Sequence, residues 1–279
     1  MITEPLGPGL SRVWDVESTT VDTRTPFQHL VIARTAQGVS LFCDDDRQST
    51  EFSQLTYHEA LMVPAFLLVP AVTRVLVVGS SEGVASEMSV TAGASVVDHV
   101  DIDQQAVELC AEHLPYGYTP DALAAAVRGD GPIRVHYADG HRFVEESTGA
   151  YDVIVVDLPD ERPEFAQHNR LYEAEFLDRC KALLSPGGVV VCQAGCQTMW
   201  RNETLVRSWQ RFSSVFAETV YYGSDEHEWA FLFGLAEALP DSLATMTARL
   251  ETLPYRPETI DALALRGNTI PPYRVRNPG

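Results

Sequence analysis

Residues 73–90 (TRVLVVGSSEGVASEMSV) constrain the fold more than any other part of the chain. Residues 75–78 form an apolar run of the length of a strand buried on both faces, and the run ends in the small-residue turn 79–83. We expect a helix to start in this turn, because serine is a good N-cap and an acid suits a first helical turn. A second strand over residues 95–100 then ends in the acidic segment 101–103. This order predicts the nucleotide-binding half of a doubly wound sheet.

Acidic or small residues follow four of the predicted strands. They are Gly79 with Glu82, Asp101, Asp139 with Gly140, and Asp157 with Asp160. Ligands of such sheets bind at the carboxyl ends of the strands, where the turn lets the backbone approach and an acid can hold ribose hydroxyls. Carboxylates packed together destabilise one another unless a cation binds. The pattern therefore favours a ligand with ammonium or sulfonium groups, although any one of these aspartates could be only a helix cap or turn residue.

Composition narrows the classes of partner. The chain has 279 residues, 45% of them hydrophobic, and a formal net charge of −19, which argues against a nucleic-acid partner. No apolar run is long enough to span a bilayer, and no signal-peptide pattern opens the sequence. The five cysteines lack the paired spacing of a zinc site. We therefore expect a cytoplasmic protein with no metal site and no membrane partner.

The order of predicted elements suggests two domains. Residues 1–12 are expected to be loose, three antiparallel strands are expected within residues 13–42, and Gln37-Gly38 is their hairpin turn. A helix over residues 54–68 leads into the central strand. Further helices are expected at 106–113, 141–146, 171–184 and 203–216, and further strands at 133–137, 151–156, 189–192, 218–222 and 229–234. The predicted fold class is α/β, with a small N-terminal antiparallel β domain (1–60) and a Rossmann-like doubly wound domain (61–279).

These motifs resemble the spermidine synthase family of polyamine aminopropyltransferases over residues 28–233. Residues 57–59 (YHE) precede the turn as they do in that family, and residues 100–103 (VDID) resemble its ribose-binding segment. Residues 151–160 (YDVIVVDLPD) resemble its Asp-x-x-Asp catalytic loop, which is the most specific of these matches. The resemblance implies a class I methyltransferase-like fold and transfer of an aminopropyl group from decarboxylated S-adenosylmethionine to a polyamine or other amine. It also implies a homodimer or homotetramer.

The resemblance also implies roles for individual residues. Asp160 would orient and deprotonate the acceptor amine, and Asp157 would hold amino groups. The donor site would comprise Gln28, Tyr57, His58, Gly79, Glu82, Gly83, Asp101, Ile102, Asp139, Gly140 and Asp157. The acceptor pocket would comprise Tyr57, Asp157, Asp160, Tyr222 and Trp229.

The chain departs from the family most on the acceptor side. Residues 222–228 (YGSDEHE) replace the family's Tyr-Pro-Ser-Gly stretch, and Glu82 replaces an aspartate in the donor turn. Two alternatives stay open: a methyltransferase or other enzyme that uses intact S-adenosylmethionine on the same scaffold, and a non-catalytic relative. Glu82 with Asp157 would repel the carboxylate of the intact cofactor, which favours the aminopropyl interpretation. The identity of the acceptor is not predicted.

Overall fold

The computed structural model describes residues 1–7, 9–161, 166–224 and 226–277, so position 225 of the predicted acceptor stretch lies outside the described residues. The strands, in chain order, are β1 (Ile2–Gly7), β2 (Leu10–Trp14), β3 (Ser18–Arg24), β4 (His29–Thr35), β5 (Gly38–Cys43), β6 (Asp46–Thr50), β7 (Arg74–Gly79), β8 (Val96–Asp101), β9 (Ile133–Tyr137), β10 (Tyr151–Asp157), β11 (Leu184–Cys196), β12 (Glu218–Gly223) and β13 (Trp229–Leu235). The α-helices are α1 (Gln54–Leu68), α2 (Val84–Thr91), α3 (Gln104–His113), α4 (Pro120–Arg128), α5 (Gly140–Glu146), α6 (Ala174–Ala182), α7 (Glu203–Val215), α8 (Ser242–Arg249), α9 (Ala262–Asn268) and α10 (Tyr273–Arg276). Two 3₁₀ turns are η1 (Gln167–Tyr172) and η2 (Leu250–Thr252).

The main sheet is a doubly wound sheet with β7 near its centre. Its strand order is β12-β13-β11-β10-β7-β8-β9. Strands β7 to β11 run parallel, whereas β13 pairs antiparallel with β11, and β12 pairs antiparallel with β13. The chain leaves β7 for β8 on one side and later returns to β10 on the other, so their carboxyl ends frame the switch point where such sheets bind ligands. The predicted fold class, a Rossmann-like sheet of the class I methyltransferase type, is confirmed.

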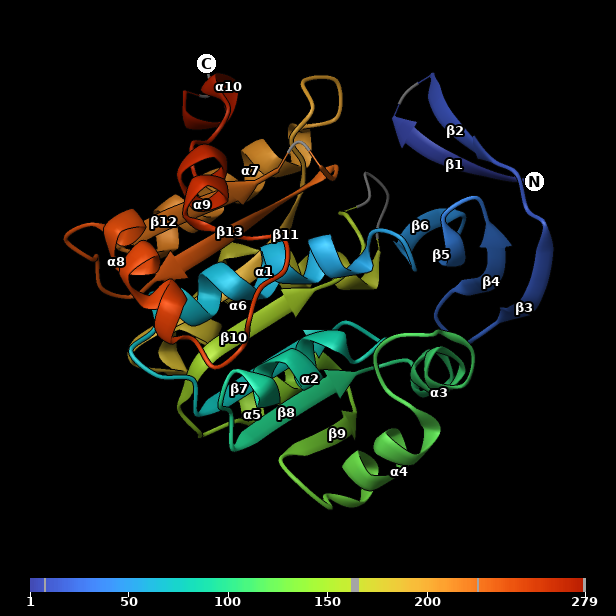
Figure 1. Cartoon of the computed structure of the whole chain (residues 1–279), viewed down its shortest axis with the longest axis horizontal. Coiled ribbons are helices and arrows are strands. Elements are labelled where there is room, and N and C mark those ends of the chain that lie inside the picture. The colour runs from blue at the N-terminus through green and yellow to red at the C-terminus, as the bar shows by residue number, and fades with distance from the viewer. Residues whose placement is uncertain (8, 162–165, 225, 278–279) are drawn as a thin grey trace.

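Alternate residues of the central strands point into two separate cores. Val75 and Val77 of β7 pack with α1 and α2 on one face, while Leu76 and Val78 pack on the other face with α6 and α7. Both faces are covered by helices (Figure 1). Because β7 is buried from both sides in this arrangement, the strand is a continuous apolar run, as its sequence predicted.

The N-terminal residues form two small sheets rather than a loose segment. Strands β1 and β2 pair as an antiparallel hairpin, and β3 to β6 form a four-stranded antiparallel sheet. The prediction that residues 1–12 are loose is therefore wrong. The carboxylate of Glu4 is buried in this hairpin and accepts a 2.7 Å hydrogen bond from the indole nitrogen of Trp14, which compensates its burial. The four-stranded sheet packs on α3, and Figure 1 shows it beyond the carboxyl ends of β7 and β8.

Helix α2 begins later than predicted. It starts at Val84, and its N-cap is Gly83 in the left-handed conformation, with no side-chain cap. The expectation of a serine cap is wrong, because the hydroxyl of Ser81 instead donates a 2.8 Å hydrogen bond to Asp101. Pro186 and the two glycines after it lie in the irregular first part of β11, after α6 has ended at Ala182.

Helix α1 connects the small sheets to the main sheet and anchors the C-terminal segment. Its predicted bounds, Gln54–Leu68, are confirmed, and the predicted domain boundary at residue 60 falls inside it. The division into residues 1–60 and 61–279 therefore stays a proposal. The buried carboxylate of Glu59 accepts hydrogen bonds from the hydroxyls of Tyr255 and Thr259 and from two backbone N–H groups of the C-terminal segment. No helix within the described ranges has the length and hydropathy of a membrane span.

Candidate active site

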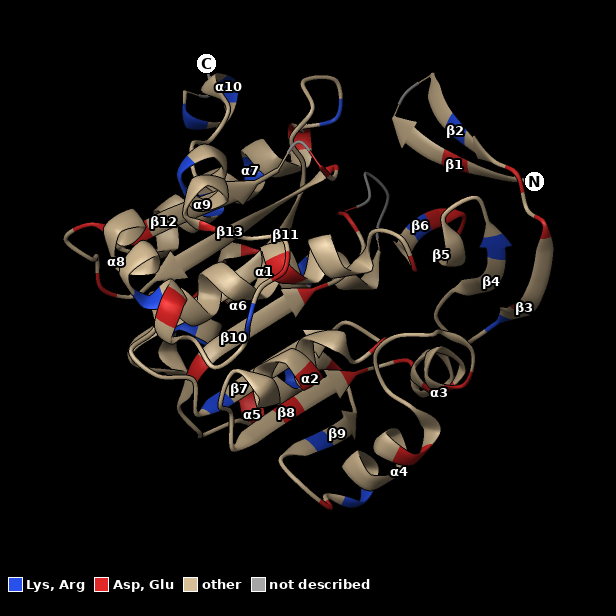
Figure 2. Cartoon of the chain, in the orientation of Figure 1, with Lys and Arg blue, Asp and Glu red and all other residues tan. Residues whose placement is uncertain are grey.

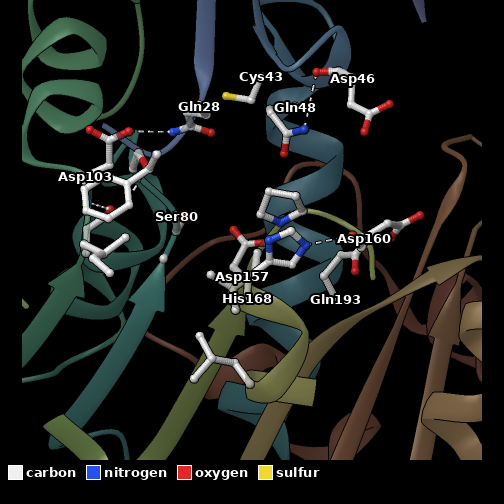
Figure 3. A pocket seen from close by; sticks show the side chains of 18 of the residues that line it. Gln28, Cys43, Asp46, Gln48, Ser80, Asp103, Asp157, Asp160, His168 and Gln193 are labelled. Carbon is white, nitrogen blue, oxygen red and sulfur yellow. Dashed lines mark hydrogen bonds between the residues drawn. The ribbon is translucent and has the colours of Figure 1, made fainter. Parts of the chain in front are cut away.

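A cavity of about 450 Å³ opens at the carboxyl ends of β7, β8 and β10, beneath the four-stranded sheet (Figure 3). Most of the predicted site residues line it: Gln28, Tyr57, Gly79, Glu82, Asp101, Ile102, Asp139, Gly140, Asp157, Asp160 and Trp229. Figure 2 shows acidic positions at the ends of β8 and β10, which are Asp101 and Asp157. The structure therefore brings together the carboxylates that the sequence placed after separate strands.

The turn after β7 fits tightly against β10. A Cβ at Gly79 would collide with the carbonyl oxygen of Asp157, and this glycine has a φ of +81°. The N–H of Ser80 donates a 2.9 Å hydrogen bond to the same carbonyl oxygen. His99 holds the turn in place through two contacts. Its Nε2 lies 2.9 Å from the carbonyl oxygen of Gly79, and its Nδ1 lies 2.9 Å from the hydroxyl of Tyr118. Burial lowers the pKa of His99 to about 4, so the imidazole is neutral and Nε2 donates to the carbonyl.

Asp101 ends β8 at the rim of the cavity. Its carboxylate accepts 2.8 Å hydrogen bonds from the N–H of Asp103 and the hydroxyl of Ser81. Burial raises the pKa of Asp101 to about 6, although these two hydrogen bonds act in the opposite direction. Asp103 in turn accepts a 2.9 Å hydrogen bond from Gln28, which ties the four-stranded sheet to this rim. Asp101 is thus a buried carboxylate held by neutral donors, an arrangement that suits hydroxyl donors of a ligand.

Asp139 is held by a different set of partners. It is the N-cap of α5, accepting from the N–H groups of His141 and Arg142, and it forms an ion pair with Arg170. Burial alone would raise the pKa of Asp139, but the Arg170 guanidinium and these hydrogen bonds hold it below its usual range. Arg170 lines the cavity and was not predicted.

Asp157 and Tyr57 form a half-buried pair in the lining of the cavity. The hydroxyl of Tyr57 donates a 2.5 Å hydrogen bond to Asp157. Burial raises the pKa of Asp157, the nearby His58 opposes this shift, and the negative charge of Glu82 adds to it. The pKa of Tyr57 lies well above its usual range because of burial and of Asp157, so this tyrosine stays a donor.

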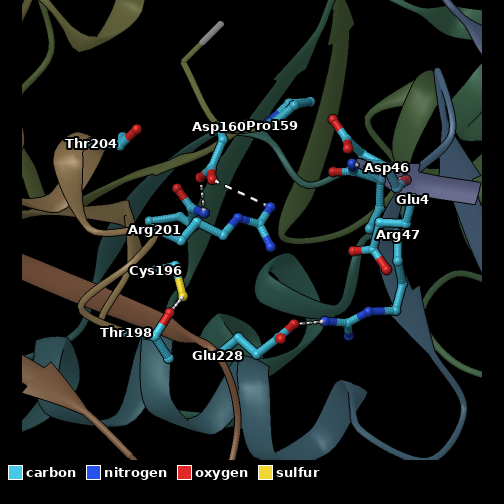
Figure 4. A network of polar contacts seen from close by, with 12 residues as sticks. Glu4, Asp46, Arg47, Pro159, Asp160, Cys196, Thr198, Arg201, Thr204 and Glu228 are labelled. Carbon is cyan, nitrogen blue, oxygen red and sulfur yellow. Dashed lines mark hydrogen bonds and ion pairs between the residues drawn. The ribbon is translucent and has the colours of Figure 1, made fainter. Parts of the chain in front are cut away.

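Asp160 lies three residues beyond Asp157 and also lines the cavity. Gln193 of β11 donates a 2.7 Å hydrogen bond to it, and Nη2 of Arg201 lies 3.9 Å from its other oxygen (Figure 4). Burial raises the pKa of Asp160, while Gln193 and Arg201 act against that shift. The guanidinium of Arg201 also lies over the ring of Trp229, 4.9 Å from the ring centre. Gln193 and Arg201 line the cavity and were not predicted.

Three predicted site residues do not line the cavity. The Nδ1 of His58 lies 2.7 Å from the carbonyl oxygen of Gln54 on its own helix, so His58 faces the helix and acts on Asp157 only electrostatically. Gly83 is covered by the ring of Tyr118, which occupies the space that a Cβ would need. Tyr222 is buried in the core beside α1, and its hydroxyl accepts a hydrogen bond from the side chain of Asn268.

Comparison with known proteins identifies the family. Residues 54–224 match the model of the spermine/spermidine synthase domain. The chain belongs to the spermine/spermidine synthase family. A polyamine aminopropyltransferase of Synechococcus sp. is 33% identical over 228 residues, which cover 79% of this chain and 70% of the relative. A polyamine aminopropyltransferase of Saccharolobus islandicus is 28% identical over 226 residues, which cover 78% of this chain and 72% of the relative.

Solved structures of the spermine/spermidine synthase family share the fold. Spermidine synthase from Thermotoga maritima superposes with a TM-score of 0.83 at 17% identity, covering 99% of this chain and 92% of that one. A spermidine synthase in complex with the transition state analogue AdoDATO gives a TM-score of 0.85 at 18% identity, covering 99% and 93%. The family predicted from the sequence motifs is confirmed, while the roles of individual site residues stay predictions.

Proposed function

We propose that this chain transfers an aminopropyl group from decarboxylated S-adenosylmethionine to an amine. The observation that carries the proposal is a cluster of carboxylates in one cavity, of which Glu82 and Asp101 are buried and Asp157 and Asp160 are half-buried. Such a cluster is destabilising unless a cation binds, and the decarboxylated donor brings a sulfonium and an ammonium without a carboxylate. The curated relatives carry the name polyamine aminopropyltransferase, which supports the same assignment.

The donor would lie along the turn after β7 and the ends of β8 and β9. Asp101 would accept hydrogen bonds from the ribose hydroxyls, since its carboxylate lies at the carboxyl end of a parallel strand. Asp139 would lie at the adenine end, where Arg170 fixes its orientation. Glu82 and Asp157 would face the ammonium of the donor tail. A carboxylate at that position, as in the intact cofactor, would be repelled by both side chains.

The chain's part in the reaction would be to orient the two substrates and to accept one proton. The acceptor amine is an ammonium in water and must lose a proton before it can attack. Asp160 would attract this ammonium and take the proton, and Asp157 with Tyr57 would hold amino groups beside the donor. The amine nitrogen then bonds to the carbon next to the sulfonium. The carbon–sulfur bond breaks with its electrons on sulfur, which leaves as a neutral thioether, so charge and atoms balance.

Calorimetry with the two donors tests this proposal against the alternatives. We expect decarboxylated S-adenosylmethionine to bind more tightly than the intact cofactor. Tighter binding of the intact cofactor would favour a methyltransferase, and binding of neither would favour a non-catalytic relative. A cytoplasmic location and a homodimeric or homotetrameric state stay predictions that fractionation and light scattering can test.

A further inference from the structure

The lining of the cavity includes two arginines near the proposed acceptor side that a polyamine site does not need. Arg47 and Arg201 both line the cavity, together with the acidic residues Glu4, Asp46 and Asp160. A polyamine presents an ammonium at each end, and a guanidinium close to the far end would repel it. The two arginines therefore affect which amines can bind in the site.

Arg47 is already neutralised by neighbouring carboxylates. Its Nη2 lies 2.9 Å from Glu228 (Figure 4). Glu228 also pairs with Arg12, and Arg12 contacts the buried carboxylate of Glu4. Two arginines and two glutamates make this group neutral overall. This group of four side chains connects the N-terminal hairpin and β6 to the residue that precedes β13. Because its charges cancel, it does not attract a charged ligand.

Arg201 is not neutralised in the same way. Its side chain is only 14% exposed, and Asp160, at 3.9 Å, is the one carboxylate of the described residues within 4 Å of its guanidinium, while Glu228 interacts with its charge from farther away. Its Nη1 is buried and makes no hydrogen bond to the described part of the chain. Packing over the ring of Trp229 holds the guanidinium in place. A buried N–H group without a partner is costly, so Arg201 is positioned for an acceptor atom that a ligand can bring.

Gln193 also contacts Asp160 and places a hydrogen-bond acceptor beside it. Its Nε2 donates to Asp160, which leaves its Oε1 buried without a hydrogen-bond partner in the described ranges. Around Asp160 there are therefore a carboxylate and an amide oxygen that suit an ammonium, and beside them a guanidinium that suits an anion. This arrangement complements a molecule with both charges.

We propose that the acceptor is an amine that also carries a carboxylate, an amino-acid-like compound rather than a polyamine. Its ammonium would bind Asp160 and the Oε1 of Gln193, and its carboxylate would bind Arg201. A single guanidinium matches a singly charged carboxylate in geometry and in charge. This inference rests on the proposed aminopropyl transfer and names the substrate class of that same site.

Three acceptors with the same aminobutyl backbone length test the inference: putrescine, 4-aminobutyrate and butylamine, which differ in having an ammonium, a carboxylate or a methyl group at the far end. Each is incubated with the protein and decarboxylated S-adenosylmethionine, and kcat/KM is obtained from the thioether formed. We expect 4-aminobutyrate to exceed putrescine by about tenfold or more, the scale of one charge-assisted hydrogen bond. A preference for putrescine would overturn the inference while leaving the proposed function intact. No transfer to any of the three would overturn the proposed function and the inference with it.

An Arg201→Met variant separates recognition from folding. Methionine keeps an apolar stem over Trp229 but removes the charge, so kcat/KM for 4-aminobutyrate should fall by about 10- to 100-fold and the ratio to putrescine should reverse. The matched control is Arg179→Met, which makes the same change on α6 at a side chain that is 40% exposed and pairs with Glu145 and Glu175. An equal loss with all three acceptors in Arg201→Met would show that Arg201 only supports the structure, and would refute its role as the carboxylate anchor.

Discussion

Asp101→Asn should stabilise the ligand-free protein while weakening donor binding. Asp101 is 6% exposed, and burial raises its pKa from the usual 3.8 to about 6. A shift of about two units, at about 1.4 kcal/mol each, means that the ionised carboxylate costs about 3 kcal/mol of folding free energy at neutral pH. Asparagine preserves both hydrogen bonds, because its oxygen can accept from the N–H of Asp103 and its amide can donate to the hydroxyl of Ser81.

The sign of the pH dependence follows from the raised pKa. Between about pH 4 and pH 6 the folded protein holds the Asp101 proton more tightly than the unfolded chain does. The stability of the wild type therefore falls as the pH rises through this window, and the loss is complete above about pH 6. The asparagine side chain of the variant does not titrate. The advantage of Asp101→Asn is thus largest above pH 6 and shrinks as the pH approaches 4.

Urea unfolding of both proteins without ligand, at pH 8 and pH 5, measures this effect. We expect the gap in free energy of unfolding to be about 3 kcal/mol at pH 8 and about half of that at pH 5. Calorimetry should show donor binding weakened by about 1–3 kcal/mol. Asp139→Asn is the matched control, and it should lower the free energy of unfolding rather than raise it. The reason is that Arg170 and the helix N–H groups hold the pKa of Asp139 below its usual range, so the ionised carboxylate stabilises the folded protein. A variant at Asp101 that is less stable than the wild type at pH 8, or a gap that does not change with pH, would refute the reasoning.

Three further substitutions test other parts of the account. Asp160→Asn should lower turnover by about 10²–10⁴ in single-turnover kinetics with little change in donor binding, and near-normal turnover would remove it as the base. Glu82→Gln should narrow the preference for decarboxylated over intact donor in calorimetry, and an unchanged ratio would place Glu82 away from the donor tail. Glu59→Gln should destabilise the fold by about 1–3 kcal/mol in urea, because the amide nitrogen replaces one carboxylate oxygen and would face either the Tyr255 hydroxyl and the N–H of Glu258, or the N–H and hydroxyl of Thr259. An unchanged free energy of unfolding would show that this anchor contributes nothing.

The central part of the fold could be predicted because its strands are buried on both faces. Such strands are continuous apolar runs, as β7 and β10 are. The bounds of the edge strand β9 and of helix α1 matched the prediction as well. Helix α4 was missed although its signals are present, with Thr119 as N-cap, Pro120 at the first position and Gly129 as C-cap. The hairpin of β1 and β2 was missed for a different reason. Its buried Glu4 needs the Trp14 indole as a partner, and that pairing exists only in the folded structure.

The residues proposed for the donor could be placed in the cavity from the sequence better than those proposed for the acceptor. The carboxylates proposed for the donor directly follow strands, so topology alone places them on one edge of the sheet. Gln193 follows the buried run 189–192 and could have been found by the same rule. Arg201 lies in a loop and Arg170 in a short 3₁₀ turn, and nothing in the local sequence indicates that they reach the cavity. Tyr222 was misplaced because its hydroxyl turns to Asn268 in the core.

The most direct test of the proposed function is the mass of the product. The protein is incubated with an equal mixture of decarboxylated and intact S-adenosylmethionine and with a panel of amines and amino acids, and the products are identified by mass spectrometry. We expect acceptors enlarged by an aminopropyl group, together with the thioether of the decarboxylated donor. Methylated acceptors with the thioether of the intact cofactor, and no aminopropyl products, would contradict it.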